Sequence, residues 1–361
     1  MYNAIIEQLL SGATPSVPEL VSLLELTPGK DLDTLFSAAY QVKLRHTGNK
    51  IFLRGLIEFS NICRKNCYYC GIRRGNHKVK RYQISADEIV RQAMVADRMN
   101  LGSVVLQSGE RSDPEFIDFV EDVLLRIKKE SNGRLGITLS AGEQTEETYR
   151  RWFLAGAHRY LLRIETSDPV LYTKLHPADH SWQKRRDCLS LLSGIGYQTG
   201  TGVMLGMPFQ TAEQIARDIL FFQENNIDMI GMGPYIIHED TPLAKEVKSF
   251  NPEKQLFLGL KTIAVTRLLL KDVNIASTTA LQALHPEGRM KGLLAGANVI
   301  MPNFTETCRR ENYQLYQGKP GISDDSSSCL NELKEEAANI GEKIAWGSWG
   351  DPLHFFARRK S

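Results

Sequence analysis

The sequence lacks long hydrophobic runs, an excess of either charge and an abundance of cysteine. No stretch approaches the roughly 20 uninterrupted apolar residues that a membrane-spanning helix requires, and residues 1–20 show neither a basic start nor a signal-peptide cleavage site. The net charge of +2 gives no reason to expect nucleic acid or an anionic membrane as a partner. Six cysteines in 361 residues, without a secretory signal, argue against a disulfide framework. We therefore expect a protein of the reducing cytoplasm.

The sequence does contain many short apolar segments rich in β-branched residues, with helical patterns between them. Their near-continuous apolar character is typical of parallel strands that are covered on both faces. We expect such strands at residues 54–61, 103–110, 135–143, 159–166, 197–206, 228–236, 274–280 and 298–302.

Two of the helical segments begin with the spacing of a capping box, Ser85 with Glu88 and Thr211 with Gln214. Strands that alternate with helices at intervals of about 20–40 residues predict an α/β protein with a parallel sheet. A single (β/α)8 barrel of the TIM type fits the length of the chain, because such barrels take about 250 residues plus extensions. The pattern alone leaves a doubly wound open sheet as an alternative.

The barrel hypothesis divides the chain into three parts. We expect a helical N-terminal extension at residues 1–50, the barrel at residues 51–305 and a C-terminal extension that packs on the barrel at residues 306–361. Active-site groups of such barrels lie at the carboxyl ends of the strands. Polar residues follow several predicted strands here, although helix caps and turns also make such junctions polar. Polar strand ends alone therefore do not identify an active site, and a more specific sequence motif is required.

That motif is a group of three cysteines in the stretch NICRKNCYYCGIRRG, residues 61–75. A disulfide between two of Cys63, Cys67 and Cys70 would leave one thiol over. Structural zinc normally takes four protein ligands, and no second Cys or His pair with metal-ligand spacing lies nearby. A [4Fe–4S] cluster held by three thiolates, in contrast, leaves one iron open to an exchangeable ligand. The basic residues of the stretch would offset the charge of the cluster and favour the thiolates.

A Cys-x3-Cys-x2-Cys loop after the first barrel strand resembles the signature of the radical S-adenosylmethionine (SAM) superfamily. The resemblance implies that these cysteines bind one [4Fe–4S] cluster, whose open iron chelates SAM. It further implies an enzyme that cleaves SAM reductively to a 5′-deoxyadenosyl radical, with electrons from a donor such as flavodoxin or ferredoxin. The residues that match SAM-contacting positions of the family are Tyr69, Ser108, Gly109 and Glu110 in the place of a Gly-Gly-Glu motif, Arg163, Glu165, Arg185 and Met229.

Longer stretches, among them IEFSNICRKNCYYCGIRR, VVLQSGE, RYLLRIET and GMGPYIIHEDTPLA, are similar to the HydE family of [FeFe]-hydrogenase maturases over about residues 45–320. The likeness implies hydrogenase cofactor assembly, by action on an amino-acid-derived substrate or a cysteine-bound iron carbonyl–cyanide species. It implies HydG and HydF as functional partners. The residues matched to the inner, substrate end of the barrel are Arg54, Thr138, Thr278, Thr279 and Tyr313.

The sequence departs from this family at two places. Some members bind a second cluster through three C-terminal cysteines, but Gly321, Cys329 and Glu332 occupy those positions here, so we expect no second cluster. Ile164 stands where the family has His between Arg and Glu, and Ile can neither titrate nor donate a hydrogen bond. We expect Cys188 to be a small buried hydrophobe and Cys308 to be structural or solvent-facing.

Three functions therefore remain open at the level of sequence. A HydE-like paralogue or a methylornithine-synthase-like enzyme would share the SAM-binding residues and act on another small substrate. A non-catalytic carrier of an iron–sulfur or organometallic precursor would need the three cysteines alone. The joint presence of Glu110, Glu165 and Arg185 favours an enzyme over a carrier.

Overall fold

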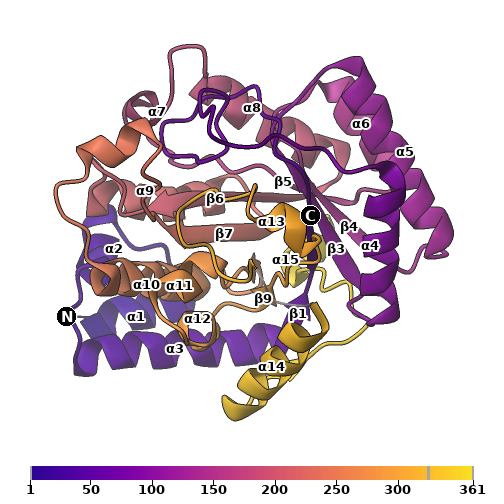
Figure 1. Cartoon of the computed structure of the whole chain (residues 1–361). Coiled ribbons are helices and arrows are strands. Elements are labelled where there is room, and N and C mark those ends of the chain that lie inside the picture. The colour runs from indigo at the N-terminus through magenta and orange to yellow at the C-terminus, as the bar shows by residue number, and fades with distance from the viewer. Residues whose placement is uncertain (1, 323–325, 360–361) are drawn as a thin grey trace.

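The computed structural model describes residues 2–322 and 326–359, and its centre is a parallel β-sheet (Figure 1). Seven strands run in the order β2-β3-β4-β5-β6-β7-β8, and every neighbouring pair is parallel. Each strand lies within a segment that the sequence predicts. The strands are β2 (Gly55–Ser60), β3 (Ser103–Ser108), β4 (Gly136–Ser140), β5 (Arg159–Leu161), β6 (Gln198–Leu205), β7 (Met229–Pro234) and β8 (Asn274–Ile275).

Helices connect these strands, and both predicted capping boxes are present. The Ser85 hydroxyl accepts a hydrogen bond from the backbone N–H of Glu88 at the start of α4 (Ala86–Arg98), and Thr211 does the same for Gln214 at α9 (Ala212–Glu224). The other helices between strands are α5 (Pro114–Glu130), α6 (Glu146–Leu154), α7 (Pro169–Leu175), α8 (Trp182–Ile195), the 3-10 helix η1 (Pro242–Glu246), α10 (Pro252–Leu269), α11 (Thr279–Leu284) and α12 (Gly288–Leu294). None of the helices within the described residues is long and apolar enough to cross a membrane.

The N-terminal segment is helical, as the sequence predicts, with α1 (Tyr2–Ser11), α2 (Val17–Leu24) and α3 (Lys30–Thr47). These helices pack against α9 and α10, below the sheet in the view of Figure 1. A buried ion pair between Lys43 and Glu342, 2.6 Å long, ties α3 to the C-terminal part of the chain. The two ends of the sequence therefore support the same side of the molecule.

A second, three-stranded sheet lies beside the first. Its order is β10-β1-β9, with β1 (Lys50–Leu53), β9 (Val299–Ile300) and β10 (Lys343–Ile344). β1 leads directly into β2, and the backbone N–H of Leu56 donates to the carbonyl of Pro302, just beyond β9. On the other side, the N–H of Asn298 donates to the carbonyl of Ile275 in β8. The predicted strand at residues 298–302 thus lies between the last and the first strands of the large sheet.

The C-terminal part, which includes α13 (Thr307–Arg310), α14 (Ser326–Asn339) and α15 (Leu353–Arg358), contains a feature that the sequence does not predict. Residues 347–351 lie across the amino ends of the strands. The buried guanidinium of Arg159 donates from Nη2 to the carbonyl of Trp349 at 2.6 Å and pairs with Asp351 at 2.8 Å. Asn274 Nδ2 donates to the carbonyl of Gly350 at 2.6 Å. We call residues 347–351 the floor, because they lie under the amino ends of the strands. The pairing of β10 with β1 fixes the chain shortly before this segment.

Candidate active site

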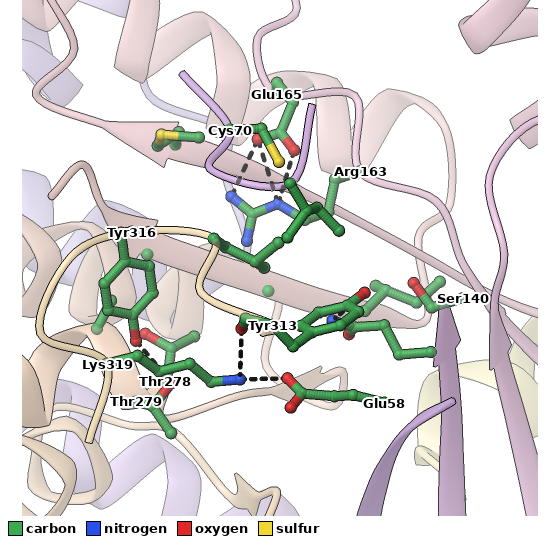
Figure 2. Close-up of a pocket in the computed structure, with 18 of the residues that line it drawn as sticks. Glu58, Cys70, Ser140, Arg163, Glu165, Thr278, Thr279, Tyr313, Tyr316 and Lys319 are labelled. Carbon is green, nitrogen blue, oxygen red and sulfur yellow. Dashed lines mark hydrogen bonds and ion pairs between the residues drawn. The ribbon is translucent and has the colours of Figure 1, made fainter. Parts of the chain in front are cut away.

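A cavity of about 330 Å³ lies at the carboxyl ends of the strands and extends between them (Figure 2). The sequence analysis named residues from several separate segments as site candidates, and the fold brings most of them to this one cavity. Those that line it are Cys63, Cys67, Tyr69, Cys70, Ser108, Gly109, Glu110, Arg163, Glu165, Arg185, Thr278, Thr279 and Tyr313.

The loop at residues 61–84, which carries the three cysteines, is folded around one guanidinium. Arg81 Nη1 donates to the carbonyls of Asn61 and Ile72, both at 2.7 Å, and its Nη2 donates to the carbonyl of Arg73 at 2.6 Å. Because one rigid, multiply hydrogen-bonded cation spans the loop, the cysteines keep a defined arrangement without regular secondary structure.

The end of β3 packs directly on this loop, which explains the glycine of the SGE motif. A Cβ at Gly109 would lie 2.5 Å from the carbonyl oxygen of Ile62 and 2.8 Å from the Cβ of Cys63, closer than such atoms can approach. The next residue, Glu110, donates its backbone N–H to Cys63 Sγ at 3.3 Å. Glycine at this position is therefore required for contact between the motif and the cysteine loop.

The three thiols all line the cavity. Burial raises the pKa of Cys63, Cys67 and Cys70, to about 12 for Cys67. Such thiols stay protonated near neutral pH, whereas a coordinating metal removes the proton. No fourth cysteine lines the cavity among the described residues. The donor set therefore fits a [4Fe–4S] cluster with one open iron, and it does not supply the four protein ligands of a structural zinc site.

Two histidines that the sequence analysis did not single out adjoin the loop. His176 Nδ1 donates to the carbonyl of Tyr172 at 2.9 Å, so its Nε2 accepts from the hydroxyl of Tyr69 at 3.0 Å. The ring of His180 lies 5.5 Å from that of His176, and its Nδ1 is 3.9 Å from Cys67 Sγ. Burial lowers the pKa of His176 to about 3 and that of His180 to about 4. Both rings are therefore neutral at physiological pH.

Two carboxylates and three cations form a network beside the cavity, and one of the cations, Arg64, lies with its Nη2 3.0 Å from Glu110 Oε1. Glu143 accepts from Arg185 Nε at 2.7 Å and from Lys65 Nζ at 2.9 Å. Glu110 lies 3.4 Å from Arg185 Nη2 and 3.5 Å from Lys65 Nζ. Burial by itself raises the pKa of Glu143, but Arg185 and Lys65 outweigh it and bring that pKa to about 2. The network thus holds the carboxylate of Glu143 ionised although it is buried.

Arg163 and Glu165 form a second ion pair, which Figure 2 shows beside Cys70. Arg163 Nε donates to Glu165 Oε1 at 3.0 Å, and its Nη2 donates to the carbonyl of Val203 at 2.8 Å. Glu165 has a φ of 68°, in the left-handed region that side chains rarely adopt. Such backbone strain costs on the order of 1–3 kcal/mol and is concentrated at functional sites. Here it accompanies a carboxylate that lines the cavity.

The opposite end of the cavity, which we call the inner end, holds hydroxyl groups and one buried ion pair (Figure 2). The hydroxyls of Thr279 and Tyr316 are 2.9 Å apart and share a hydrogen bond. Thr278 Oγ1 is buried without a hydrogen-bond partner among the described residues. Lys319 Nζ pairs with Glu58, and both side chains are almost completely buried. At the inner end, the hydroxyl of Thr278 is therefore without a hydrogen-bond partner among the described residues, whereas the charges of Lys319 and Glu58 compensate each other.

Comparison with known proteins agrees with this geometry. The model of the Radical SAM superfamily matches residues 57–222. The [FeFe] hydrogenase maturase subunit HydE of Thermotoga maritima is 44% identical over 318 residues, which are 87% of this chain and 88% of that protein. This chain belongs to the radical SAM superfamily.

The superfamily also includes more distant relatives of the chain. The 3-methylornithine synthase of Methanosarcina acetivorans is 28% identical over 314 residues, 86% of this chain and 85% of that protein. The crystal structure of methylornithine synthase (PylB) has a TM-score of 0.79 at 25% identity and covers 95% of this chain and 97% of that one. As a radical SAM enzyme, this chain uses a [4Fe–4S] cluster and SAM.

Three residues predicted for the radical SAM site are not among the residues that line this cavity. Arg54 Nη1 donates to Met229 Sδ at 2.9 Å, and Met229 is the first residue of β7, at its amino end. Thr138 Oγ1 accepts from Arg159 Nη1 at 3.4 Å. All three side chains are buried near the floor, where Gly350 accepts from Arg54. They contribute to the packing of the amino ends of the strands and do not line the cavity.

Ile164, the departure from the family pattern, also lies outside the cavity lining. Its side chain is completely buried in the hydrophobic core, and its backbone N–H donates to Thr201 Oγ1 at 3.0 Å. Arg163 and Glu165, the residues before and after Ile164, line the cavity, whereas Ile164 itself does not. The presence of Ile instead of His at this position therefore does not change a lining residue.

The site also contains residues that were missed. Glu143 is the last residue of the polar segment SAGE at residues 140–143, at the end of a strand. The sequence therefore contained a local signal, but this signal did not indicate a function for Glu143. Glu58 and Lys319 pair across 261 residues of sequence, and nothing local indicates such a contact. His176 and His180 lie in a helix end and a connection, where a lone histidine carries no specific signal.

The low pKa of Glu143 predicts a loss of stability in acid. Its ordinary value is 4.5 and its value in the folded protein is about 2. A carboxyl with a lowered folded-state pKa stabilises fully above the ordinary value and loses this contribution as the pH falls toward the folded-state value. On the order of 3 kcal/mol should therefore disappear between about pH 4.5 and pH 2.

Urea unfolding of the Glu143→Gln variant at a series of pH values measures this contribution. We expect the variant to be less stable than the wild type at pH 7 and the difference to shrink as the pH falls below about 4.5. The exposed neighbour Glu147, changed to Gln, is the control. A difference that stays constant down to pH 3 would contradict the assignment.

Proposed function

We propose that this radical SAM enzyme is a HydE-type maturase that acts on a small cysteine-bound iron carbonyl–cyanide substrate during assembly of the [FeFe]-hydrogenase cofactor. The observation that carries the proposal is the 44% identity to HydE over 87% of the chain. The single cavity that reaches from the cysteine loop to the inner hydroxyl groups supports it, because it offers separate places for SAM and a small substrate.

We infer that the strands form a closed (β/α)8 barrel. The backbone hydrogen bonds on both sides of the strand at residues 298–302 support this inference, since they connect β8 to β2. A closed barrel with a floor at its amino end would exclude water and competing C–H bonds from the cavity, which a reactive primary radical requires.

In this proposal Cys63, Cys67 and Cys70 hold the cluster. When bound, the cluster and SAM together supply a 5′-deoxyadenosyl radical after one-electron reduction. The protein contributes the environment: the Arg81-centred loop fixes the ligands, and the contact of Glu110 N with Cys63 Sγ places the SGE segment beside them. Hydrogen bonds and burial of this kind are the levers by which a protein tunes a cluster.

The charged residues of the cavity wall suit the polar ends of SAM. Glu110 is assigned to the amino group of its methionine part, and Arg185 to the carboxylate, which a planar guanidinium binds with two hydrogen bonds. Glu165 is assigned to the ribose hydroxyls, and Arg163 holds it in place. Tyr69, oriented by its hydrogen bond to His176, is assigned to the adenine. Ser108 and Gly109 complete the wall next to Glu110.

The substrate is assigned to the inner end, with Thr278, Thr279 and Tyr313 as its polar contacts. The unused hydroxyl of Thr278 supports this assignment, because a buried hydroxyl without a partner is unfavourable until a ligand supplies one. In the same proposal HydG delivers the substrate, HydF is a further functional partner, and a flavodoxin or ferredoxin of the cytoplasm supplies the electron.

The proposed function is tested by anaerobic reconstitution and turnover with SAM, dithionite and the synthetic cysteine-bound iron carbonyl–cyanide complex. We expect 5′-deoxyadenosine and an adenosylated product of the complex by mass spectrometry, and support of hydrogenase maturation. Slow SAM cleavage that is not coupled to the complex would overturn the HydE assignment and favour a paralogue with another substrate, while the radical SAM assignment would stand.

Two threonine variants separate substrate binding from folding. Thr278→Val should leave the melting temperature unchanged or slightly raised, because the lost hydroxyl has no hydrogen-bond partner within residues 2–322 and 326–359. Thr279→Val removes the hydrogen bond to Tyr316 and should cost about 1 kcal/mol of stability. Both should lower the yield of adenosylated product per SAM cleaved, with the Kd for SAM unchanged. Equal losses of SAM binding and of coupling would show that the substrate does not contact these hydroxyls.

A further inference from the structure

The imidazole of His180 connects two atoms of the cysteine loop. His180 lies between α7 and α8 and is 7% exposed, so water does not compete for its nitrogens. Its Nε2 accepts a hydrogen bond from the backbone N–H of Asn66 at 3.2 Å. Its Nδ1 faces Cys67 Sγ at 3.9 Å, within hydrogen-bonding reach of sulfur.

Two groups lie near Nε2, the backbone N–H of Asn66 at 3.2 Å, within hydrogen-bond distance, and Asp179 Oδ1 at 3.6 Å, beyond it, so the contact with Asn66 decides which nitrogen carries the proton. A backbone N–H can only donate, so Nε2 must present a lone pair and carries no hydrogen. The hydrogen of the neutral ring is therefore on Nδ1, the nitrogen that faces Cys67. The geometry alone thus makes His180 a donor toward this sulfur.

We propose that His180 donates an N–H···S hydrogen bond to the Cys67 thiolate and thereby raises the reduction potential of the cluster. The inference rests on the ligand role proposed above for Cys67. Reduction adds one electron, from an external low-potential donor, to the cluster and its thiolates. A hydrogen-bond donor at a ligand sulfur stabilises the more negative, reduced state, and such bonds are a recognised determinant of cluster potentials. His180 is therefore a positioning residue, which acts through Cys67 and touches neither SAM nor substrate.

The same histidines could be interpreted as ligands of a separate metal ion. The candidate ligand atoms of Cys67, His176 and His180 all lie within 4.8 Å of one another. The hydrogen bonds argue against such a site, because His176 donates from Nδ1 to the carbonyl of Tyr172 and accepts at Nε2 from Tyr69. With the proton of His180 on Nδ1, no nitrogen of either ring has a free lone pair with which it could bind a metal ion together with Cys67.

Three substitutions of His180 separate its two contacts. His180→Leu removes both. His180→Asn keeps an amide N–H near the place of Nδ1 but loses the acceptor for Asn66, whereas His180→Gln keeps an oxygen acceptor near Nε2 and loses the donor to sulfur. The matched control is His77→Leu, which removes an exposed imidazole from the same loop.

The full-length proteins are reconstituted anaerobically, assayed for iron and sulfide, and titrated potentiometrically with EPR detection of the reduced cluster. We expect the Leu and Gln variants to have a roughly tenfold smaller equilibrium constant for reduction, a potential about 59 mV more negative for one electron. The Asn variant and the His77→Leu control should stay within about threefold of the wild type.

Each other outcome has a definite meaning. A His180→Leu protein with a full cluster and an unchanged potential overturns the proposal. A shifted Asn variant beside a normal Gln variant assigns His180 to holding the backbone of Asn66, and likewise overturns it. Nitrogen bound directly to a metal, detected by pulsed EPR, would make the histidine a ligand instead. Failure of the wild type to bind any cluster would contradict the proposed function itself and not only this inference.

Discussion

A Cys67→Ala protein is expected to fold normally, to hold no stable [4Fe–4S] cluster and to cleave no SAM. Loss of an outer-sphere partner of a metal site commonly costs 10–100-fold in affinity or activity, so loss of a ligand should cost at least about 100-fold. The fold should survive, because Cys67 belongs to a partly exposed loop and its sulfur makes weak contacts, with His180 at 3.9 Å and with the side chain of Tyr69. We expect a change of about 1 kcal/mol or less in the stability of the apoprotein, and a melting temperature within about 3 °C of the wild type.

The measurements are iron content, the EPR spectrum with and without SAM, and 5′-deoxyadenosine formation. Cys308→Ala is the matched control, because Cys308 is exposed and does not line the cavity. It should bind a full cluster and cleave SAM at the rate of the wild type. A normal cluster in Cys67→Ala, or a lost cluster in Cys308→Ala, would overturn the ligand assignment.

Replacing Arg185 by methionine is expected to reduce both stability and SAM binding. The substitution leaves Glu110 and Glu143 with Lys65 and the partly exposed Arg64 as the remaining cations, and Arg64 makes no ion pair with Glu143 within the described residues. Removing one partner of a buried ion pair commonly costs 3–5 kcal/mol, because the remaining charge is buried without compensation. We expect a loss of about that size by urea unfolding of the apoprotein and at least a tenfold weaker Kd for SAM, the change produced by about 1.4 kcal/mol.

The next residue on the same helix provides the control. Arg186 is exposed, and its guanidinium lies over the ring of Trp182 at 5.9 Å. Arg186→Met should change stability by no more than about 0.5 kcal/mol and leave SAM binding intact. If Arg185→Met were as stable as Arg186→Met, the contacts of Arg185 in the network would contribute nothing to the folded state, and the pKa of Glu143 would need another cause.

The parts of the fold that could be predicted from the sequence are those with local signals. Parallel strands buried on both faces give continuous apolar segments, and each of the eight predicted segments contains a strand. The capping boxes at Ser85 and Thr211 act within four residues, so the starts of α4 and α9 were predictable too. The cysteine loop and the SGE segment were recognisable because their functional groups are close together in sequence.

The parts that could not be predicted depend on distant contacts or on strand direction. β10 consists of Lys343 and Ile344 and pairs with β1 about 290 residues earlier, without a periodic pattern of its own. Met229 was expected beside SAM, but it begins β7, and in a parallel sheet the beginning of a strand faces away from the end that carries the chemistry. A match between single residues of two sequences does not show at which end of a strand a residue lies.

The floor formed by residues 347–351 has a consequence for how the protein is made. Among the described residues, the carboxylate paired with the buried Arg159 is that of Asp351, which lies 192 residues later in the sequence and is therefore made long after β5. Until it has been made, Arg159 lacks its carboxylate partner, and Arg54 and Asn274 lack the carbonyl of Gly350. We therefore expect the large sheet to reach its final packing only after residues 347–351 have left the ribosome. Ribosome-bound chains that end at residue 346 should be cut readily by protease, whereas chains that include residues 347–361 should resist it.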